Sequence, residues 1–561
     1  MALSWLWGVV RGKTWLVGLL TLTQTLLGVT GVGNALILRS LIDAAVTKDG
    51  EMFRCVSIGF IAFITVQIAL RAANRFLEEY IRSTMENRCK KRLLANLLKR
   101  DYAAVTEVHS GEWMNRLTSD TVVVGDGLTQ IIPGAAGMLA RLLGAAVTLL
   151  VLEPRFGFLI LPGGLLLMAL TFGFRRVLKR LHKKIQEADG SLRVFLQEHL
   201  KSLLVVRAFS RERQTLEQAE KWMDAHQAAR MRRNHFSNLC NIGFAIAMRG
   251  AYVFGAVFCG YSILNGTMSY GTFTAVLQLV SQIQNPFANI TGYLPRYYAM
   301  LASAERLMEA EGFPEDGGTE RISEKEVQEI YQQSFGGIGL LDADFTYRPP
   351  VLAEGESVIM PVVLQGVFLE IHKGEYVAFT GPSGCGKSTI LKLLLCLYPL
   401  DGGSRYLLCG GSAQELTAAW RSLFAYVPQG NQLLSGTVRE VVAFGDAEKM
   451  RQEERLLDAL EIACAKEFVM ALEHGVDTSL GEQGAGLSEG QMQRLAIARA
   501  VFSNHPVLML DEATSALDEA TEARLLANLR AMTDRTVLIV THRPAALSIV
   551  DKIIDLKGSD R

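Results

Sequence analysis

Long runs of uncharged, apolar residues dominate the first 300 positions of the chain. The stretch 14–38 holds no charged side chain, and neither does 250–295, which has a turn at Asn265-Gly266. A helix needs about 20 apolar residues to cross a bilayer, and buried helices of globular proteins rarely run so long without a charge. The pattern predicts six membrane spans, at about 14–42, 53–80, 128–152, 156–176, 236–264 and 270–300.

Basic residues gather in two long polar stretches between the predicted spans. These stretches are 82–116 and 175–233, whereas the short connections 46–51, 153–155 and 265–271 are poor in Lys and Arg. Because Lys and Arg are enriched on the cytoplasmic side of membrane proteins, we expect both stretches and the N-terminus to be cytoplasmic. Both are rich in helix formers, so the flanking spans are predicted to continue as helices well beyond the membrane.

Beyond residue 306 the apolar runs stop and the character of the chain changes. A turn-rich polar segment at 312–319 is followed by strand-like and helix-like runs, which indicate a soluble α/β domain. We therefore expect a transmembrane domain at 1–306, a linker at 307–336 and an α/β domain at 337–561.

Composition adds mainly exclusions to this picture. Of 561 residues, 49% are hydrophobic and 20% are charged, which excludes a disordered chain. The 57 basic residues balance the 57 acidic ones, so we expect no nucleic acid as a partner. The eight cysteines form no CxxC pair and the nine histidines show no metal-ligand spacing, so no zinc site is predicted.

A glycine-rich segment at 381–389, Gly-Pro-Ser-Gly-Cys-Gly-Lys-Ser-Thr, fits the phosphate-binding pattern GxxxxGK[ST]. A strand-like run precedes it at 376–380 and a helix-like run follows it, which is the context that the pattern requires. Backbone N–H groups of such a loop and the helix N-terminus hold phosphates. Lys387 is expected to reach the β- and γ-phosphates of a nucleotide, and Ser388 to bind Mg²⁺. The expected nucleotide-binding residues of this loop are Gly381, Ser383, Gly384, Cys385, Gly386, Lys387, Ser388 and Thr389.

Two further strand-like runs end in side chains suited to phosphate chemistry. The run 507–512 ends in Asp511, expected to position Mg²⁺, and in Glu512, expected to polarise the attacking water as a general base. The run 535–541 ends at His542, which would lie beside the phosphate-binding strand and could contact the γ-phosphate.

These motifs, in this order, resemble those of the ATP-binding cassette (ABC) transporters. The segment Leu-Ser-Glu-Gly-Gln at 487–491 resembles the signature sequence of that family, and 481–484 resembles a loop of its exporter branch. Segments 110–120 and 206–209 are similar to its two coupling regions. The resemblance implies functions for residues that the motifs alone do not assign: Gln429 as the Q-loop glutamine, Tyr347 stacking on adenine, Ser488, Gly490 and Gln491 in the signature, Asp518 in the D-loop and His542 as the switch histidine.

The resemblance implies a half-transporter that works as a dimer. Its fold would be an α-helical, six-span transmembrane domain of exporter type joined to an α/β P-loop NTPase (RecA-like) domain with a helical subdomain. ATP and Mg²⁺ would lie between the phosphate loop of one chain and the signature of the other. Glu512, His542 and Gln429 would be catalytic, and Ser388, Gln429 and Asp511 would hold Mg²⁺. The projecting turns near 100–111 and 207–216 would transmit closure to the membrane helices.

The signature departs from the family's commonest form at one position, where Glu489 replaces Gly. Two-gene transporters of the family often pair a half that keeps its catalytic Glu and His but has an altered signature with a complementary half. We therefore expect a heterodimer, with a homodimer as the alternative.

The transported cargo is suggested only by polar residues inside the predicted spans. Charged and amide side chains there are costly and mark functional sites, or they bond between helices and snorkel to the interface. The candidates are Arg249, Gln278, Gln282 and Asn285. The resemblance implies an exporter of drugs, lipids or peptides in a bacterial cell membrane. An importer of siderophore-like cargo on the same fold, and an ATP-gated channel or sensor, remain the alternatives.

Overall fold

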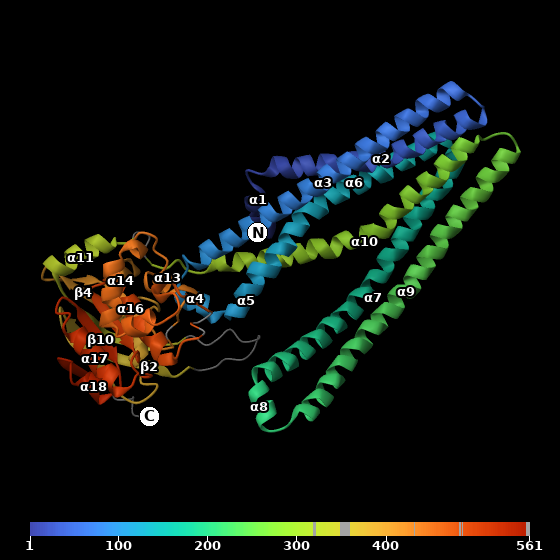
Figure 1. The fold of residues 1–561 in the computed structure, drawn as a ribbon. Coiled ribbons are helices and arrows are strands. Elements are labelled where there is room, and N and C mark those ends of the chain that lie inside the picture. The colour runs from blue at the N-terminus through green and yellow to red at the C-terminus, as the bar shows by residue number, and fades with distance from the viewer. Residues whose placement is uncertain (318–320, 348–359, 431, 482–483, 485, 557–561) are drawn as a thin grey trace. The chain divides into compact units, whose positions relative to one another are not determined.

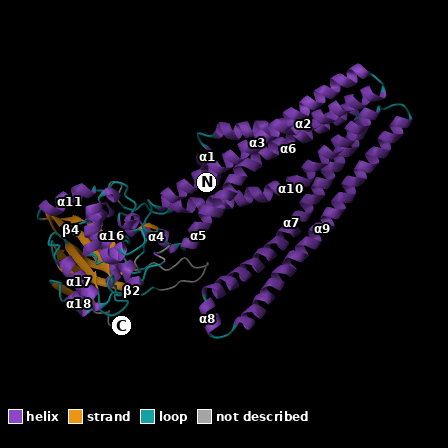
Figure 2. Ribbon diagram, viewed as in Figure 1, coloured by secondary structure: helices purple, strands orange, loops and turns teal. Residues whose placement is uncertain are grey.

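The computed structural model describes residues 1–561 except 318–320, 348–359, 431, 482–483, 485 and 557–561. The chain forms two compact units. The first comprises Met1–Arg92 and Asn115–Met308, and the second comprises Leu93–Met114 and Glu309–Arg561. Long helices build the first unit, whereas strands and shorter helices build most of the second (Figures 1 and 2).

The helices of the first unit are much longer than a bilayer is thick. α9 has 53 residues and α7 has 48, which exceeds the roughly 20 residues that one span needs. They therefore have the length for the predicted extensions. The helices that lie wholly or largely in this unit are α1 (Ala2–Val10), α2 (Thr14–Val46), α3 (Gly50–Leu97), α6 (Thr121–Leu152), α7 (Pro154–Lys201), α8 (Leu203–Ala208), α9 (Glu212–Leu264) and α10 (Tyr270–Gly312).

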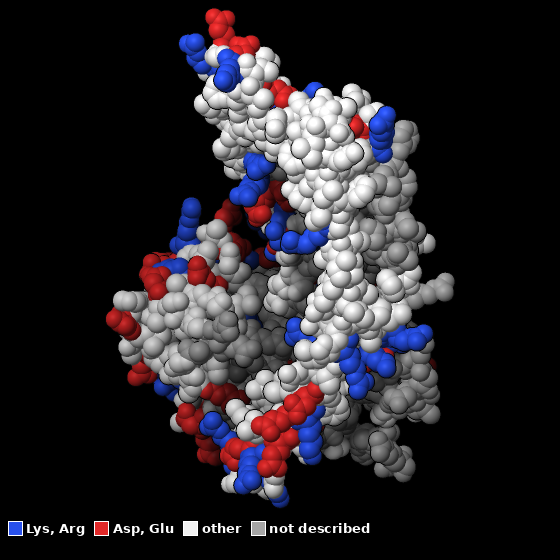
Figure 3. All heavy atoms as spheres, turned by 90° about the vertical axis from the view of Figure 1, so that its right-hand side faces the viewer, with Lys and Arg blue, Asp and Glu red and all other residues white. Residues whose placement is uncertain are grey.

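Four helical segments among the described residues are long and apolar enough to cross a membrane. They are Thr14–Val46, Gly50–Leu97, Ser110–Leu152 and Glu212–Leu264, and between 6% and 22% of each apolar window is buried. The other two predicted spans, 156–176 and 270–300, fall in α7 and α10, where part of the side chains lies outside the described set. Figure 3 shows a broad surface without charged side chains, as lipid-facing helices require.

Close contacts between small residues and the ion pair of the buried Asp120 with the exposed Arg306 help to hold the first unit together. α2 and α6 pack closely where Gly28 meets Gly137. The lack of a side chain at Gly28 permits this approach, since a Cβ there would collide with the carbonyl oxygen of Gly137. Nearer the polar end of α10, the buried carboxylate of Asp120 accepts hydrogen bonds of 2.8 Å from Ser303 and from Arg306 Nε. An unpaired buried carboxylate would be costly, so these partners fix the start of α6 against α10.

The second unit contains a five-stranded parallel sheet in the order β11-β3-β10-β9-β6. Its central strands β9 and β10 are buried along their whole length and mostly apolar, because both faces of the sheet are covered. An antiparallel sheet in the order β2-β1-β4-β5 and a β7-β8 pair complete the strands. The strands are β1 (Phe335–Thr346), β2 (Val362–His372), β3 (Tyr376–Thr380), β4 (Gly402–Cys409), β5 (Ser412–Glu415), β6 (Phe424–Val427), β7 (Gly436–Thr437), β8 (Ser479–Leu480), β9 (Val507–Asp511), β10 (Thr536–Val540) and β11 (Lys552–Asp555).

Helices cover these sheets and form a helical subdomain after β6. A large buried cluster runs from this subdomain to the parallel sheet. The helices of the second unit are α4 (Tyr102–Glu107), α11 (Glu324–Gln333), α12 (Lys387–Leu394), α13 (Val438–Val442), α14 (Glu453–Ile462), α15 (Lys466–Met470), α16 (Glu489–Ser503), α17 (Glu519–Arg530) and α18 (Pro544–Leu547). α5 (Ser110–Asn115) ends at the boundary between the units.

The stretch 307–336, expected to be a linker, is ordered wherever it is described. α10 continues to Gly312, and 313–316 then packs along 96–101 through backbone hydrogen bonds from Asp101 to Pro314 and from Asp316 to Lys99, both 3.0 Å long. Arg421 binds the carboxylate of Asp316 in an ion pair. The turn between α3 and α5 is therefore tied to the α/β unit by the chain that leads into it.

Candidate nucleotide-binding site

The phosphate-binding loop connects β3 to α12, as the sequence predicts. Gly381, Gly384 and Gly386 have φ angles of +135°, +82° and +98°, a left-handed region that favours glycine. A Cβ on Gly386 would also lie 2.6 Å from Cδ2 of Leu364. These glycines let the backbone follow a path that other residues would strain, and the loop leads into the N-terminus of α12.

Lys387 is the first residue of α12, and only 6% of it is exposed. Its Nζ donates to the carbonyl oxygens of Gly381 at 2.7 Å and Pro382 at 2.9 Å. A buried ammonium needs such partners, and here they hold it across the loop. The three protons of the ammonium can instead be donated to phosphate oxygens when a nucleotide lies in the loop.

A hydroxyl and a carboxylate meet at the end of β9. Ser388 Oγ donates to Asp511 Oδ1 at 2.7 Å, and the Tyr426 hydroxyl donates to Asp511 Oδ2 at 3.1 Å. Burial raises the pKa of Asp511 above its ordinary value, and these two hydrogen bonds partly oppose the shift. Sequence reasoning did not identify Tyr426. Its only signal is its position three residues before Gln429, at the edge of the strand that pairs with β9.

The expected general base is also held in place. Gln429 Nε2 donates to Glu512 Oε2 at 2.8 Å, and the backbone N–H of Glu512 donates to the Val540 carbonyl at 3.1 Å. Glu512 has a φ of +50°, which costs about 1–3 kcal/mol for a residue other than glycine. The strained backbone turns the chain at the end of β9, where the carboxylate stays partly exposed.

His542 follows the strand that separates the two motifs. β10 pairs in parallel with β3 on one side and with β9 on the other, so the end of β10 lies between the phosphate loop and Glu512. The His542 side chain is exposed there, within the α/β unit. This is the strand position that the sequence predicts for a contact with the terminal phosphate.

The expected adenine-stacking residue lies beside the phosphate loop. The Tyr347 hydroxyl is 3.1 Å from Thr389 Oγ1. The Tyr347 ring meets Phe345 and Tyr398 edge-on, with centroid distances of 4.8 and 5.3 Å. These contacts fix the ring near the start of α12.

The signature forms the N-terminus of α16. The Ser488 N–H donates to Gln491 Oε1 at 2.8 Å, and the Gln491 N–H donates to Ser488 Oγ at 3.3 Å, which makes a capping box. Glu489 lies exposed in the first turn, where a negative charge suits the helix dipole. A Cβ on Gly490 would lie 2.8 Å from the Ala516 carbonyl oxygen, so only glycine fits this contact.

Two residues to which the sequence analysis assigns no function, Gln493 and Arg543, hold the D-loop, 515–518. Gln493 is buried; its Nε2 donates to Ser515 Oγ at 2.9 Å and its Oε1 accepts from the Ala516 N–H at 3.0 Å. Arg543 donates to the Ser515 and Leu517 carbonyls at 2.6 and 2.8 Å. No sequence pattern marks such tertiary contacts.

Asp518 caps α17 by accepting the Thr521 N–H at 2.9 Å, and this backbone hydrogen bond lowers the pKa of Asp518. Among the described residues, hydrogen bonds join the signature helix to the D-loop, and none joins the signature to the phosphate loop. A single chain therefore brings together Ser388, Gln429, Asp511 and Glu512 beside the phosphate loop, and leaves the signature and D-loop as a separate group.

The candidate cargo residues lie on two helices of the first unit, Arg249 on α9 and the three amides on α10. Arg249 is exposed on α9, and Gln278 is half-buried on α10. Gln282 Nε2 donates to the Gly31 carbonyl of α2 at 2.7 Å, so this amide bonds between helices. The Asn285 side chain lies outside the described residues.

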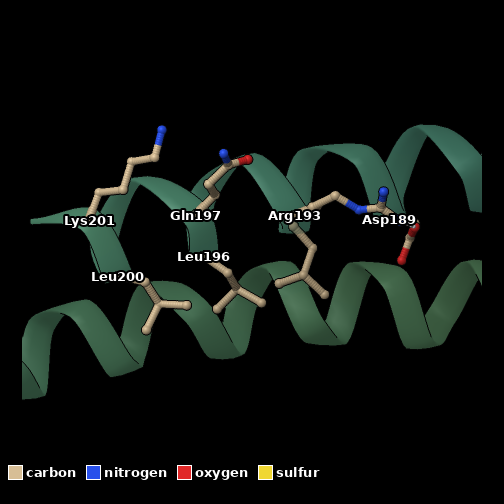
Figure 4. A pocket seen from close by; sticks show the side chains of 7 residues that line it. Asp189, Arg193, Leu196, Gln197, Leu200 and Lys201 are labelled. Atoms are coloured by element: carbon tan, nitrogen blue, oxygen red, sulfur yellow. Dashed lines mark hydrogen bonds and ion pairs between the residues drawn. The ribbon is translucent and has the colours of Figure 1, made fainter. Parts of the chain in front are cut away.

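The hollow drawn in Figure 4 contains none of these candidates. It lies on the part of α7 beyond its predicted span, where Leu196 and Leu200 point towards α9, and Gln197 and Lys201 point away from it. Asp189 and Arg193 form an ion pair of 3.2 Å at one end. This hollow therefore lies in a region that the sequence does not assign to cargo.

Comparisons with known proteins agree with both halves of the chain. Residues 17–287 match the family described as "ABC transporter transmembrane region" and 364–515 match "ABC transporter", together about three quarters of the chain. A relative from Dictyostelium discoideum, "ABC transporter B family member 1", is 28% identical over 81% of this chain, which spans about half (48%) of that protein. The "ATP-dependent lipid A-core flippase" of Chromobacterium violaceum is 28% identical, over 96% of this chain and 90% of the flippase.

A solved structure shares the fold along almost the whole chain. It is a bacterial Atm1-family ABC exporter with ATP bound, with a TM-score of 0.75 and 21% sequence identity, and the match covers 99% of this chain and 95% of the other. The predicted combination of an exporter-type helical domain with an α/β nucleotide-binding domain is confirmed.

Proposed function

Because this chain belongs to the ATP-binding cassette transporters, with the transmembrane region and the cassette fused in one polypeptide, we propose that it is an exporter-type half-transporter that dimerises. The chain is an ATPase of the kind coupled to transport. The observation that carries the proposal is the group beside the phosphate loop: Ser388 bonded to Asp511 at 2.7 Å, and Gln429 bonded to Glu512 at 2.8 Å.

Each of these side chains has a separate task in the proposed reaction. Lys387 leaves its loop carbonyls and donates to the β- and γ-phosphates of ATP. Glu512 accepts a proton from the attacking water, and Gln429 keeps the carboxylate oriented towards it. His542 contacts the γ-phosphate from the end of β10, and Tyr347 stacks on adenine.

The residues around Asp511 fit a magnesium ion. Hydroxyl and carboxylate oxygens are ligands that Mg²⁺ prefers, and Ser388 and Asp511 already lie at hydrogen-bond distance. Gln429, whose Nε2 bonds Glu512, would supply a third oxygen to the ion. The ion would neutralise charge on the phosphates.

The other half of each ATP site comes from the partner chain. Ser488, Gly490 and Gln491 form a helix N-terminus, which suits an anion, and Ser488 and Gln491 cap it by bonding each other. We propose that they complete the phosphate site of a partner, with Asp518 near the contact between the chains. Glu489 favours a partner with a different sequence, so the proposed assembly is a heterodimer.

Native mass spectrometry of the complex, purified from its own cell membrane through a tag on this chain, is expected to show two different subunit masses in equal amount. The physical reason is that a carboxylate in both signatures would lie near both triphosphates, whereas a heterodimer retains one signature without it. A fully active complex that contains this chain alone would contradict the heterodimer. That result would leave the ATPase proposal intact.

We propose that the dimer lies in the cell membrane of a bacterium, with the N-terminus and the cassette in the cytoplasm. The proposed direction is export of a drug, a lipid or a peptide-like molecule. The name of the lipid A-core flippase supports a lipid-like cargo. Arg249, an exposed cation on α9, and Gln278 support a polar or anionic group on that cargo.

Arg249→Ala is expected to weaken the apparent affinity for an anionic cargo by at least about ten-fold, because hydrogen bonds to charged groups contribute about 1.5–3 kcal/mol. Cargo-stimulated ATP hydrolysis in lipid nanodiscs measures this effect. The matched control is Arg232→Ala, which removes an exposed arginine of the same helix outside its predicted span. If every cargo stimulates ATP hydrolysis by Arg249→Ala as strongly as by wild type and at the same concentrations, Arg249 has no part in the cargo site.

A further inference from the structure

A cluster of tyrosines connects the expected adenine site to helix α4. The Tyr398 ring meets Tyr347 at a centroid distance of 5.3 Å and an interplanar angle of 86°. On its other side it meets Tyr102, the first residue of α4, at 5.7 Å and 88°. Both contacts are edge-to-face, which is a favourable geometry for aromatic rings. All three residues belong to the second unit.

Tyr398 is held by the same helix that carries the phosphate loop. It lies four residues beyond the end of α12, and Arg405 Nη1 donates 2.9 Å hydrogen bonds to the carbonyls of both Leu393 and Tyr398. Phe345 packs on its ring at 5.7 Å. A movement of the Tyr398 ring therefore requires movement of α12, Phe345 or Tyr347.

Helix α4 is partly buried within the second unit. Ala103 and Ala104 are buried, whereas 42% of Tyr102 is exposed. Thr106, one turn further along α4, donates to the Tyr102 carbonyl at 2.8 Å, within the helix. Burial raises the pKa of Tyr398. Tyr398 thus contacts α4 through its ring, which meets Tyr102.

We propose that Tyr398 is a positioning residue that makes the placement of α4 depend on adenine, through Tyr347 on one side and Tyr102 on the other. This inference rests on the proposed function, because it assumes that Tyr347 stacks on adenine. Adenine restricts the Tyr347 ring, Tyr347 restricts Tyr398, and Tyr398 presents a fixed surface to α4. Coupling of this kind is reciprocal, so the contacts of α4 must change nucleotide affinity by the same factor.

A double-mutant cycle on the purified full-length transporter measures this coupling. The readout is the Kd of N-methylanthraniloyl-ATP, a fluorescent ATP derivative, measured without Mg²⁺ so that no hydrolysis occurs. Tyr102→Ala is expected to raise the Kd about two- to ten-fold, in line with the usual strength of an aromatic pair. In a Tyr398→Leu background the same change is expected to have no effect, and in a Tyr398→Phe background it keeps its effect because the ring remains.

Tyr406→Leu is the matched control, since Tyr406 lies half-buried on β4 and its hydroxyl reaches the Leu369 carbonyl, outside the cluster. In that background Tyr102→Ala should raise the Kd as it does in wild type. The proposal is overturned if Tyr102→Ala changes the Kd by the same factor in every background. It is also overturned if Tyr102→Ala leaves the Kd unchanged in every background. Wild-type protein that binds no nucleotide would instead contradict the proposed function itself.

Hydrogen exchange supplies a second measurement that needs no folded Tyr398→Leu protein. ATP is expected to slow amide exchange of 102–107 in the wild-type transporter. Inorganic triphosphate, which fills the phosphate loop and lacks adenine, is expected to leave that segment unchanged. Equal protection of α4 by the two ligands, or no protection by ATP, would overturn the proposal.

Discussion

Glu512→Gln is expected to lower the rate of ATP hydrolysis by at least about 100-fold, because a positioned general base contributes about 10²–10⁴ in rate. Glutamine has nearly the same shape and can accept the 2.8 Å hydrogen bond from Gln429 through its carbonyl oxygen. It cannot take a proton from water. The backbone at this position has a φ of +50°, which strains glutamine and glutamate alike. The variant should therefore fold, bind ATP and fail in the chemical step.

Steady-state phosphate release in lipid nanodiscs measures this loss, and the affinity for the fluorescent ATP derivative shows whether binding survives. Glu519→Gln provides the matched control, since it makes the same chemical change at an exposed position in the first turn of α17. We expect wild-type rates for that control. Hydrolysis by Glu512→Gln within a few-fold of wild type would show that another residue is the base.

Lys387→Ala is expected to weaken ATP binding by about 10- to 150-fold, corresponding to the roughly 1.5–3 kcal/mol of a hydrogen bond between charged groups. Among the residues that the structure describes, Nζ bonds only to groups of the phosphate loop itself, with the Gly381 and Pro382 carbonyls at 2.7 and 2.9 Å and Cys385 Sγ at 3.9 Å. No described acidic side chain pairs with it, so its charge is available to phosphates.

The equilibrium Kd measured without hydrolysis separates this effect from that of Glu512→Gln. Lys373→Ala is its control, because Lys373 is a lysine of the same unit that bonds the Gln332 carbonyl instead. A Kd for Lys387→Ala equal to wild type would mean that the lysine stays on its loop carbonyls when ATP binds. The phosphate loop would then not act as its sequence indicates.

Much of the ATP site was predictable because its chemistry depends on local sequence. The glycines at 381, 384 and 386 need left-handed backbone, and a lysine and a serine must open the following helix; such requirements leave a readable pattern. The membrane spans were readable for a similar reason, since a bilayer demands long apolar runs. The general fold followed from these two parts.

Other parts depend on contacts between residues distant in sequence, which one sequence does not display. Tyr426 reaches Asp511 because β6 pairs with β9, and Gln493 and Arg543 meet at the D-loop only after α16 and β10 are in place. The packing of 313–316 along 96–101 was missed because a turn-rich polar segment reads as a free linker. Cargo specificity is harder still to predict from sequence. Gln282 bonds to the backbone of α2, but in the sequence it cannot be told from a polar residue that faces a cargo site.

ATP hydrolysis at this site is proposed to drive cargo across a membrane. Transport into sealed proteoliposomes that hold the complete dimer with the cassettes outside tests this directly, with fluorescent lipid, drug and peptide probes compared in parallel. At least one probe is expected to accumulate inside only when ATP is present, and Glu512→Gln in this chain should abolish or strongly reduce the accumulation. ATP turnover by wild type without ATP-dependent movement of any probe, or equal movement with Glu512→Gln, would contradict this proposal.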